Sequence, residues 1–259
     1  MSEKHAYDDD DSTTRKRPRV CDLPGGIPVH WWLYLSRQYQ DGLFARDAGF
    51  DFHVLSQFQF NGAPPQRWYS SEKPWSGIVI AHENKRNVTE INLSGSKLVT
   101  LPESINKLKL LTHLDMNHNK LVTLPESIGD LLILTVLNLS YNALGTLPES
   151  IGDLLILNNL DVSFNKLVTL PESINKLNSL NWLNLSDNHL KVLPESINKL
   201  KSLIVLYMPN NKLVTLPDSI SELKSLRNMS ISGNPISSTR DKRDEINRRF
   251  ARQRLYMDI

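Results

Sequence analysis

Two histidines and an aspartate lying within six residues are the side chains of this sequence best suited to chemistry. His113 and His118 flank Asp115, and imidazole and carboxylate groups together can transfer protons or bind a metal ion. Such chemistry needs a pocket that holds the groups and excludes water. The alternation of apolar and polar residues around Asp115 places the three side chains on an open strand surface, so we interpret them as surface polar residues.

The sequence contains no other combination of residues typical of an enzyme. Cys21 is the only cysteine, and there is no glycine-rich phosphate loop, GxSxG motif or His/Cys set with metal-ligand spacing. The adjacent carboxylates of Asp8–Asp11 lie in a polar tail that would not give a cation fixed ligands. We therefore expect no catalysis, no cofactor, no bound metal and no small-molecule substrate.

The histidines and the aspartate belong to a repeat of 23 residues. Three residue types recur six times with this period. They are Asn119, Asn142, Asn165, Asn188, Asn211 and Asn234; Pro102, Pro125, Pro148, Pro171, Pro194 and Pro217; and Ile105, Ile128, Ile151, Ile174, Ile197 and Ile220. A fixed period of this length, with leucines in phase, predicts a solenoid, and solenoids usually bind other molecules.

Each unit is predicted to begin with a short strand. Leu114 and Met116 alternate with His113 and Asp115, and successive side chains of a strand point to opposite faces. We therefore expect Leu114 and Met116 to face the core, and His113 and Asp115 to face outward.

The rest of the unit is predicted to turn and return along a second limb. Pro125 cannot donate a ladder hydrogen bond, so this limb is not a central strand. The spacing of three between Ile128, Leu131 and Leu134 favours a short helical or 3₁₀ segment. The amide of Asn119 can both donate and accept, so we expect it to satisfy backbone groups of its own and adjacent coils.

Residues 87–236 resemble a leucine-rich-repeat domain of seven units, and the block LPESIxxLxxLxxLxLxxNxL resembles the intracellular Ras-group subclass. The resemblance implies an α/β solenoid, an arc with a parallel sheet on its concave face that binds proteins. The first unit departs from the pattern, because Ser96 replaces the asparagine, as is common where a unit meets a cap.

The flanks divide the rest of the chain into three regions. Residues 1–20 are charged and predicted to be disordered. Residues 21–86 are rich in aromatic residues, which predicts a folded N-terminal cap with a helix over residues 30–39 and a strand at Ile78–Ile80. Residues 237–259 are predicted to form a helical C-terminal cap, with a helix over residues 240–256 whose Ile246, Phe250 and Leu255 face the repeats.

Composition favours a cytoplasmic protein that binds neither nucleic acid nor membrane. The net charge is only +2, which gives no general attraction for an anionic surface. A single cysteine and a polar N-terminus without a signal peptide indicate a reducing compartment. The basic run Arg15–Arg19 offers nuclear localisation as an alternative.

Three columns of strand side chains are not needed for the core. The first column contains Glu90, His113, Val136, Asn159, Trp182, Val205 and Asn228. The second contains Asn92, Asp115, Asn138, Asp161, Asn184, Tyr207 and Ser230. The third, just before the repeated asparagine, contains Gly95, His118, Tyr141, Phe164, Asp187, Asn210 and Gly233.

Large apolar residues in these columns, with polar residues around them, are typical of a protein-binding surface. The predicted partner-binding residues are His113, Asp115, His118, Val136, Tyr141, Phe164, Trp182, Asp187, Val205 and Tyr207, with Asp161 also at the rim. The alternative is that these side chains pack on one another or beneath an N-terminal segment.

The sequence therefore predicts a non-catalytic intracellular adaptor or scaffold for signal transduction, monomeric, with a protein partner on the concave face. The alternative is a substrate receptor of a ubiquitin ligase, in which residues 21–86 recruit the ligase. Leu23–Pro28, followed by an aromatic segment, is similar to the start of an F-box, although residues 50–74 lack the leucine-rich helices of that family.

Overall fold

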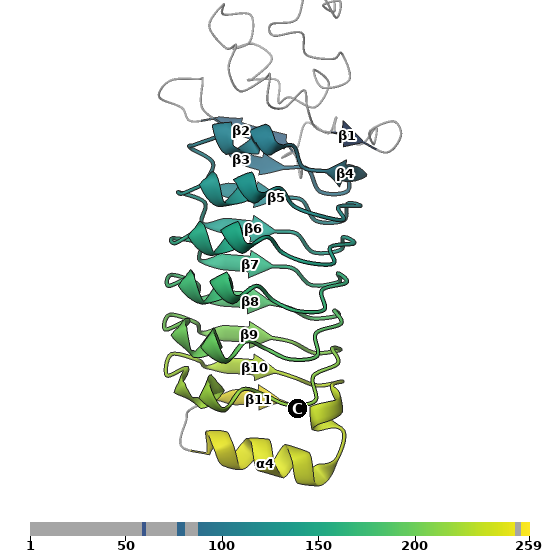
Figure 1. The fold of residues 1–259 in the computed structure, drawn as a ribbon, viewed down its shortest axis with the longest axis vertical. Coiled ribbons are helices and arrows are strands. Elements are labelled where there is room, and N and C mark those ends of the chain that lie inside the picture. The colour runs from purple at the N-terminus through teal and green to yellow at the C-terminus, as the bar shows by residue number, and fades with distance from the viewer. Residues whose placement is uncertain (1–58, 61–76, 81–87, 252–254) are drawn as a thin grey trace, which may run out of the picture.

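The computed structural model describes residues 59–60, 77–80, 88–251 and 255–259 (Figure 1). The predictions for residues 1–20, the helix over residues 30–39 and the F-box-like segment lie outside the described residues. Among the described residues, no helix has both the length and the apolar character needed to cross a membrane.

The strands form one long sheet that runs the length of the repeats. Its order is β11-β10-β9-β8-β7-β6-β5-β3-β2, with β2 antiparallel to β3 and the other eight strands parallel (Figure 1). The strands are β2 Gly77–Ile80, β3 Val88–Asn92, β5 His113–Asp115, β6 Val136–Asn138, β7 Asn159–Asp161, β8 Trp182–Asn184, β9 Val205–Tyr207, β10 Asn228–Ser230 and β11 Tyr256–Asp258. A separate pair joins β1 Gln59–Phe60 to β4 Leu98–Thr100.

Short 3₁₀ helices form the return limb of each unit, as the spacing of three predicted. They are η3 Glu103–Lys107, η4 Glu126–Asp130, η5 Glu149–Asp153, η6 Glu172–Lys176, η7 Glu195–Lys199, η8 Asp218–Glu222 and η9 Pro235–Ser237. In η3 to η8 the repeated proline is the N-cap, and in η3 to η7 its backbone is extended. Its missing N–H costs nothing at a helix start, so the proline sets where each helix begins.

The core lies between the sheet and the row of 3₁₀ helices (Figure 1). Leu114 and Met116 are buried, as predicted, and Ile128, Leu131 and Leu134 of the same unit are fully buried as well. The two strand positions are buried in all seven units and the three positions of the return limb in the first six, which gives one continuous cluster along the solenoid. Because each unit completes the apolar environment of its neighbours, the repeats stabilise one another.

The C-terminal region differs from the single helix that the sequence predicted. Helix α4 spans Arg240–Phe250, and Tyr256–Asp258 forms β11 beside β10, so the predicted extension of the helix to residue 256 is wrong. The strand forms because β10 would otherwise present an open edge of unpaired backbone groups: the N–H of Ile231 donates to Asp258, and the N–H of Tyr256 donates to Arg227.

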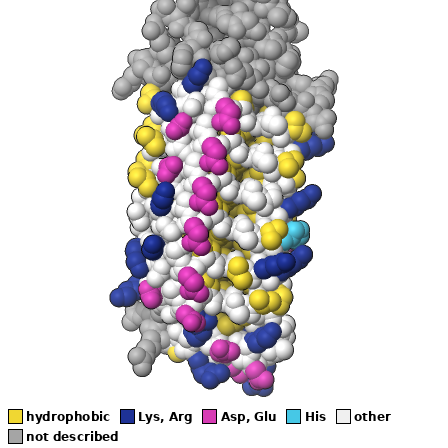
Figure 2. Space-filling view, in the orientation of Figure 1, with side chains coloured by type: hydrophobic (Ala, Val, Ile, Leu, Met, Phe, Trp, Pro, Cys, Tyr) yellow, Lys and Arg dark blue, Asp and Glu magenta, His cyan; other side chains and the backbone are white. Residues whose placement is uncertain are grey.

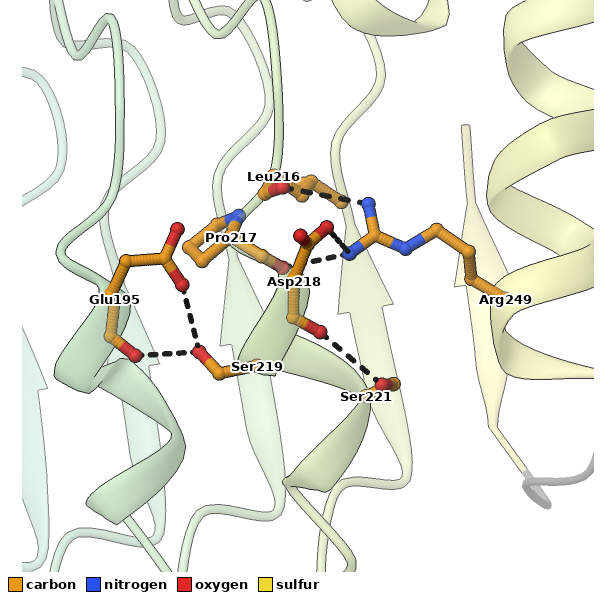
Figure 3. Close-up of polar contacts among 7 residues, drawn as sticks. All are labelled: Glu195, Leu216, Pro217, Asp218, Ser219, Ser221 and Arg249. Atoms are coloured by element: carbon orange, nitrogen blue, oxygen red, sulfur yellow. Dashed lines mark hydrogen bonds and ion pairs between the residues drawn. The ribbon is translucent and has the colours of Figure 1, made fainter.

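Helix α4 docks on the end of the repeats, as the sequence predicted. Its apolar residues Ile246 and Phe250 are buried in the core cluster, and Leu255, just beyond the helix, packs partly against it. The guanidinium of Arg249 donates to the carbonyl oxygens of Leu216 and Pro217, at 3.4 and 2.8 Å (Figure 3). The helix therefore both covers apolar surface and satisfies backbone groups of the last full unit.

At the other end, the strand predicted at Ile78–Ile80 is present as part of β2. It pairs antiparallel with β3, and its register places Val79 opposite Glu90. The first repeat strand is thus paired on both sides, which removes an exposed edge.

Candidate functional site

The repeated asparagine fixes the coil geometry on which the exposed columns depend. In the unit of β7, the amide nitrogen of Asn165 donates to the carbonyl oxygens of Leu139, Val162 and Ser163, at 2.9 to 3.1 Å. Its Oδ1 accepts from the N–H of Leu144 at 2.9 Å. Equivalent bonds occur at Asn119, Asn142, Asn188, Asn211 and Asn234. This residue is structural, as predicted, and it joins adjacent coils.

The sheet register aligns the first two columns as the sequence predicted. The parallel strands of successive units pair without offset, so that Trp182 lies beside Val205 and Asn184 beside Tyr207. On the other side of β7, Val136 lies between His113 and Asn159. The outward positions of successive units are therefore lateral neighbours across the whole sheet.

The third column has a backbone conformation that the sequence analysis did not predict. His118, Tyr141, Phe164, Asp187 and Asn210 all have φ between 53 and 56°, and Gly95 and Gly233 occupy the two ends at 66 and 71°. The signal was present in the sequence, because glycine, asparagine, aspartate and histidine are the residues enriched at positive φ. Large aromatic residues are rare in this conformation.

Three rings of the third column form a continuous stack. His118 and Tyr141 have ring centroids 4.1 Å apart at an interplanar angle of 12°, and Tyr141 and Phe164 are 4.1 Å apart at 8°. Tyr141 remains 42% exposed and Phe164 41%. The side chains thus pack on one another, as the alternative interpretation held, and still present a large ring surface.

The energy of the stack does not explain the presence of these rings. Each aromatic pair contributes about 0.5–1.5 kcal/mol, whereas a left-handed backbone costs a residue with a Cβ about 1–2 kcal/mol. The two stacked pairs therefore contribute about as much as the left-handed backbone costs at Tyr141 and Phe164. The same left-handed backbone recurs at this position in every unit, so it belongs to the repeat, and stability gives no reason for aromatic residues at two of these positions.

A second aromatic contact lies on the sheet itself. Trp182 and Tyr207 are half-buried, with ring centroids 6.4 Å apart at an interplanar angle of 89°. Val205, beside Trp182 in the sheet, is also half-buried. Together with the stack, this pair gives the described sheet two aromatic groups on positions that the core does not use.

The polar residues of the second column stabilise the turn that follows each strand, a role that the sequence analysis missed. Oδ1 of Asp115 accepts from the N–H of Asn117 at 3.0 Å, and Oδ1 of Asp161 accepts from the N–H of Ser163 at 2.9 Å. The asparagines of this column make the same bond. In the unit of β9 the acceptor is replaced by Tyr207, and the residue two further along is Pro209, which has no N–H to donate.

Burial raises the pKa of the Asp115 carboxyl above its usual value. Hydrogen bonds from Asn117 act in the opposite direction and lower it, while the charge of Asp161 raises it further and that of His118 lowers it. Ionised Asp115 is therefore less favourable on the sheet than in water, because it is partly buried and lies near the carboxylate of Asp161.

The histidines of this unit interact with different partners and do not converge on one point. Nδ1 of His113 lies 3.8 Å from Oε1 of Glu90 and 2.9 Å from Oγ1 of Thr112, while His118 stacks on Tyr141. No group of three or more His, Cys, Asp or Glu residues that could hold a metal ion occurs in the described part of the chain. The arrangement is that of surface polar residues.

Two family models match most of the repeat region. The model described as a leucine-rich-repeat region matches residues 161–247, and the model described as a leucine-rich repeat matches residues 110–131 and 134–154. The chain is therefore a leucine-rich-repeat protein. A comparison with curated proteins found no match to the sequence.

Solved structures of leucine-rich-repeat proteins are similar to this chain. The ectodomain of the plant membrane receptor kinase GASSHO1/SCHENGEN3 from Arabidopsis thaliana, in complex with CASPARIAN STRIP INTEGRITY FACTOR 2, is 26% identical over 62% of this chain and 20% of that one, with a TM-score of 0.57. The plant peptide hormone receptor RGFR1, in complex with RGF2, is 26% identical over 62% of this chain and 33% of that one, with a TM-score of 0.48. The protein LIC12759 of Leptospira interrogans is 28% identical over 66% of this chain and 54% of that one, with a TM-score of 0.39.

The chain thus spans between 20% and 54% of the length of these proteins. The first of them confirms the leucine-rich-repeat solenoid with its parallel sheet.

Proposed function

We propose that this chain is a non-catalytic adaptor or scaffold that binds another protein through the exposed face of its parallel sheet. Leucine-rich repeats are generally protein-interaction modules. The similar plant receptor ectodomain was solved in complex with CASPARIAN STRIP INTEGRITY FACTOR 2. Within this proposal the repeats belong to the intracellular Ras-group subclass, supported by the LPESI blocks. The cytoplasm is the compartment, supported by the presence of a single cysteine.

The observation that carries the proposal is the pair of aromatic groups on the sheet face. Tyr141 and Phe164 are exposed on a left-handed backbone that glycine or asparagine would adopt at lower cost, and Trp182 with Tyr207 occupies strand positions that asparagine fills in other units. Trp and Tyr are the residue types that most often dominate binding energy. A partner that covers these rings explains their presence where folding stability does not.

The test replaces the aromatic residues of each group with asparagine, which other units have at the same positions. One variant is Tyr141→Asn with Phe164→Asn, after Asn210, and the other is Trp182→Asn, after Asn159 and Asn228. The full-length chain is used to capture and identify its partner by affinity purification with mass spectrometry, and binding is then measured with the purified partner. We expect each variant to bind at least about tenfold more weakly, because hot-spot residues contribute ~1.4 kcal/mol or more.

The matched control removes exposed apolar residues from another surface. Leu132 and Leu155 are 60% and 52% exposed on the loops that precede the strands, and Asn178 holds the same position in a later unit. Leu132→Asn with Leu155→Asn should leave binding unchanged. The proposal would be contradicted if the control lost as much binding as the sheet variants. It would also be contradicted if both sheet variants kept full binding and unfolded at the same midpoint as the wild type.

A further inference from the structure

The sheet face is acidic although the whole chain carries a net positive charge. The seven six-residue segments that form the three columns are 90–95, 113–118, 136–141, 159–164, 182–187, 205–210 and 228–233. They contain four carboxylates, Glu90, Asp115, Asp161 and Asp187, and no lysine or arginine. The full chain contains 30 lysine and arginine residues and has a net charge of +2. Lysine and arginine are therefore absent from these segments in particular. On the opposite side of the molecule, the column of acidic residues has Lys and Arg side chains near it (Figure 2).

Two of the four carboxylates lie in the same units as rings of the stack. Asp115 shares its unit with His118, and Asp161 shares its unit with Phe164. Asp187 follows Phe164 in the third column, one unit further on, where its Oδ1 accepts a hydrogen bond of 3.1 Å from Nδ2 of Asn210. Asp187 and Asp161 are half-buried. The face thus offers ring surface and negative charge side by side.

This combination matches the chemistry of arginine and lysine side chains. Their aliphatic stems pack on apolar surface while the charged heads remain free to pair with carboxylates. Both faces of the Tyr141 ring are covered by His118 and Phe164, so a stem would lie along the ring edges. A phosphate backbone, by contrast, would meet only like charge on this face.

We propose that the part of the partner protein bound on the sheet face is a polypeptide segment rich in arginine and lysine. This inference rests on the proposed function and adds the chemical class of its partner. The cost of burying the ionised carboxylate of Asp115 is then offset by cations of the partner when it binds.

The probe is a synthetic, fluorescein-labelled peptide of alternating arginine and serine, with an alternating glutamate–serine peptide as its charge control. Binding to the full-length chain is followed by fluorescence polarisation at low ionic strength. The variant is Asp161→Asn with Asp187→Asn, in which asparagine keeps a hydrogen-bond acceptor. We expect the arginine peptide alone to bind, and the double variant to bind it about 2- to 30-fold more weakly, because each of the two ion pairs contributes ~0.2–1 kcal/mol.

The matched control removes two charges from the 3₁₀-helix side. Glu149→Gln with Glu172→Gln changes the net charge by the same amount, and glutamine can still accept the hydrogen bonds from Ser173 and Ser196. This control should bind the arginine peptide as the wild type does. Equal weakening in the two double variants, or failure of the arginine peptide to bind, would overturn the inference.

Two further arms separate this inference from the proposed function and from self-binding. Loss of the captured partner in the Tyr141→Asn, Phe164→Asn variant but not in the Asp161→Asn, Asp187→Asn variant would leave the proposed function intact and overturn the cationic partner. Loss in neither variant would overturn both. A variant with Arg15, Lys16, Arg17 and Arg19 replaced by glutamine tests whether the chain's own basic run binds the sheet face. If this variant binds the peptide more tightly than the wild type, the basic run occupies the face. That result would also overturn the proposal of a separate partner.

Discussion

At the scale of single residues, two adjacent positions of each unit determine which side chains are exposed at the turn after the strand. The repeated asparagine inside the turn satisfies backbone groups of two coils, so its identity is fixed by the fold. The residue before it has a left-handed backbone, for which glycine or asparagine suffices. The aromatic residues at this second position in two consecutive units are therefore the residues whose identity the fold does not explain.

The asparagine ladder predicts a large and local loss of stability. Asn165→Ala removes three donated and one accepted hydrogen bond in the buried turn. We expect the free energy of unfolding to fall by about 3 kcal/mol or more, because each buried group left unsatisfied costs ~1–3 kcal/mol. Urea denaturation followed by circular dichroism measures the loss. Asn159→Ala, at an exposed position of the same unit, is the control and should change stability by less than about 0.5 kcal/mol.

The raised pKa of Asp115 predicts a pH-dependent effect of Asp115→Asn. A carboxyl whose pKa is higher in the folded than in the unfolded state favours folding most below the unfolded value, near 3.8, and loses that contribution as the pH rises through the folded pKa. Asparagine occupies this position in other units and keeps the acceptor for Asn117. The variant should therefore be more stable than the wild type at pH 7, with a difference that shrinks as the pH falls toward 3.8.

Urea unfolding of both proteins at several pH values tests this expectation. A variant that is less stable than the wild type at neutral pH would show that the hydrogen bonds of the ionised carboxylate outweigh the cost of its burial.

At the scale of elements, the 3₁₀ helices differ in how much room they leave for a side chain at one equivalent position. Gly129 of η4 and Gly152 of η5 lie against the backbone of the next unit, whereas the corresponding position holds Asn106, Asn175 and Asn198 in other units. A Cβ at Gly152 would overlap the carbonyl oxygen of Ser173 and lie 2.6 Å from its Cβ. The coils on either side of η5 are thus packed too closely for the side chain that the repeat pattern allows.

Gly152→Ala should consequently destabilise the protein. The atom that it meets is backbone, which cannot rotate away, and overpacking of this kind costs about 1–3 kcal/mol. Gly145→Ala is the matched control, since no heavy atom lies within 4 Å of a Cβ there, and it should be neutral or slightly stabilising. Thermal unfolding compares the two, and an equally stable Gly152→Ala variant would show that the coils separate without cost.

At the scale of the whole molecule, the repeats form a linear array closed at both ends by pairing. Strand β2 covers the first repeat strand and β11 covers the last, while α4 buries the apolar end of the core. Each unit contacts its neighbours, so stability is distributed along the array and not concentrated at one site.

Deletion of one full unit should therefore leave a folded protein. Removal of residues 146–168 joins Gly145 to Thr169, keeps the period, and places β8 beside β6. We expect cooperative unfolding with a smaller urea m-value, because less surface is exposed on unfolding. The deletion also shortens the ring stack by Phe164, so partner binding should weaken while the fold persists. Loss of cooperative unfolding would show that this unit is needed to hold the two ends together.

Much of the fold was predictable because the 23-residue period repeats each local signal. The strand at Leu114 and Met116, the 3₁₀ limb after Pro125 and the structural asparagines follow from spacing alone, since each depends on contacts within a unit or with an identical neighbour. The alignment of the three columns follows for the same reason. The ring stack was not predictable from the columns alone, because it also depends on the backbone conformation that brings the rings 4.1 Å apart.

The sequence by itself determined the solenoid and the three columns of side chains that its core does not use. The tertiary structure decided the features that depend on contacts between coils that are not equivalent or on the ends of the array. These are the close approach at Gly152 and the strand at Tyr256–Asp258 that replaces the end of the expected helix. A repeat pattern specifies what neighbouring units share, whereas an unpaired edge or a close contact exists only once the coils are stacked.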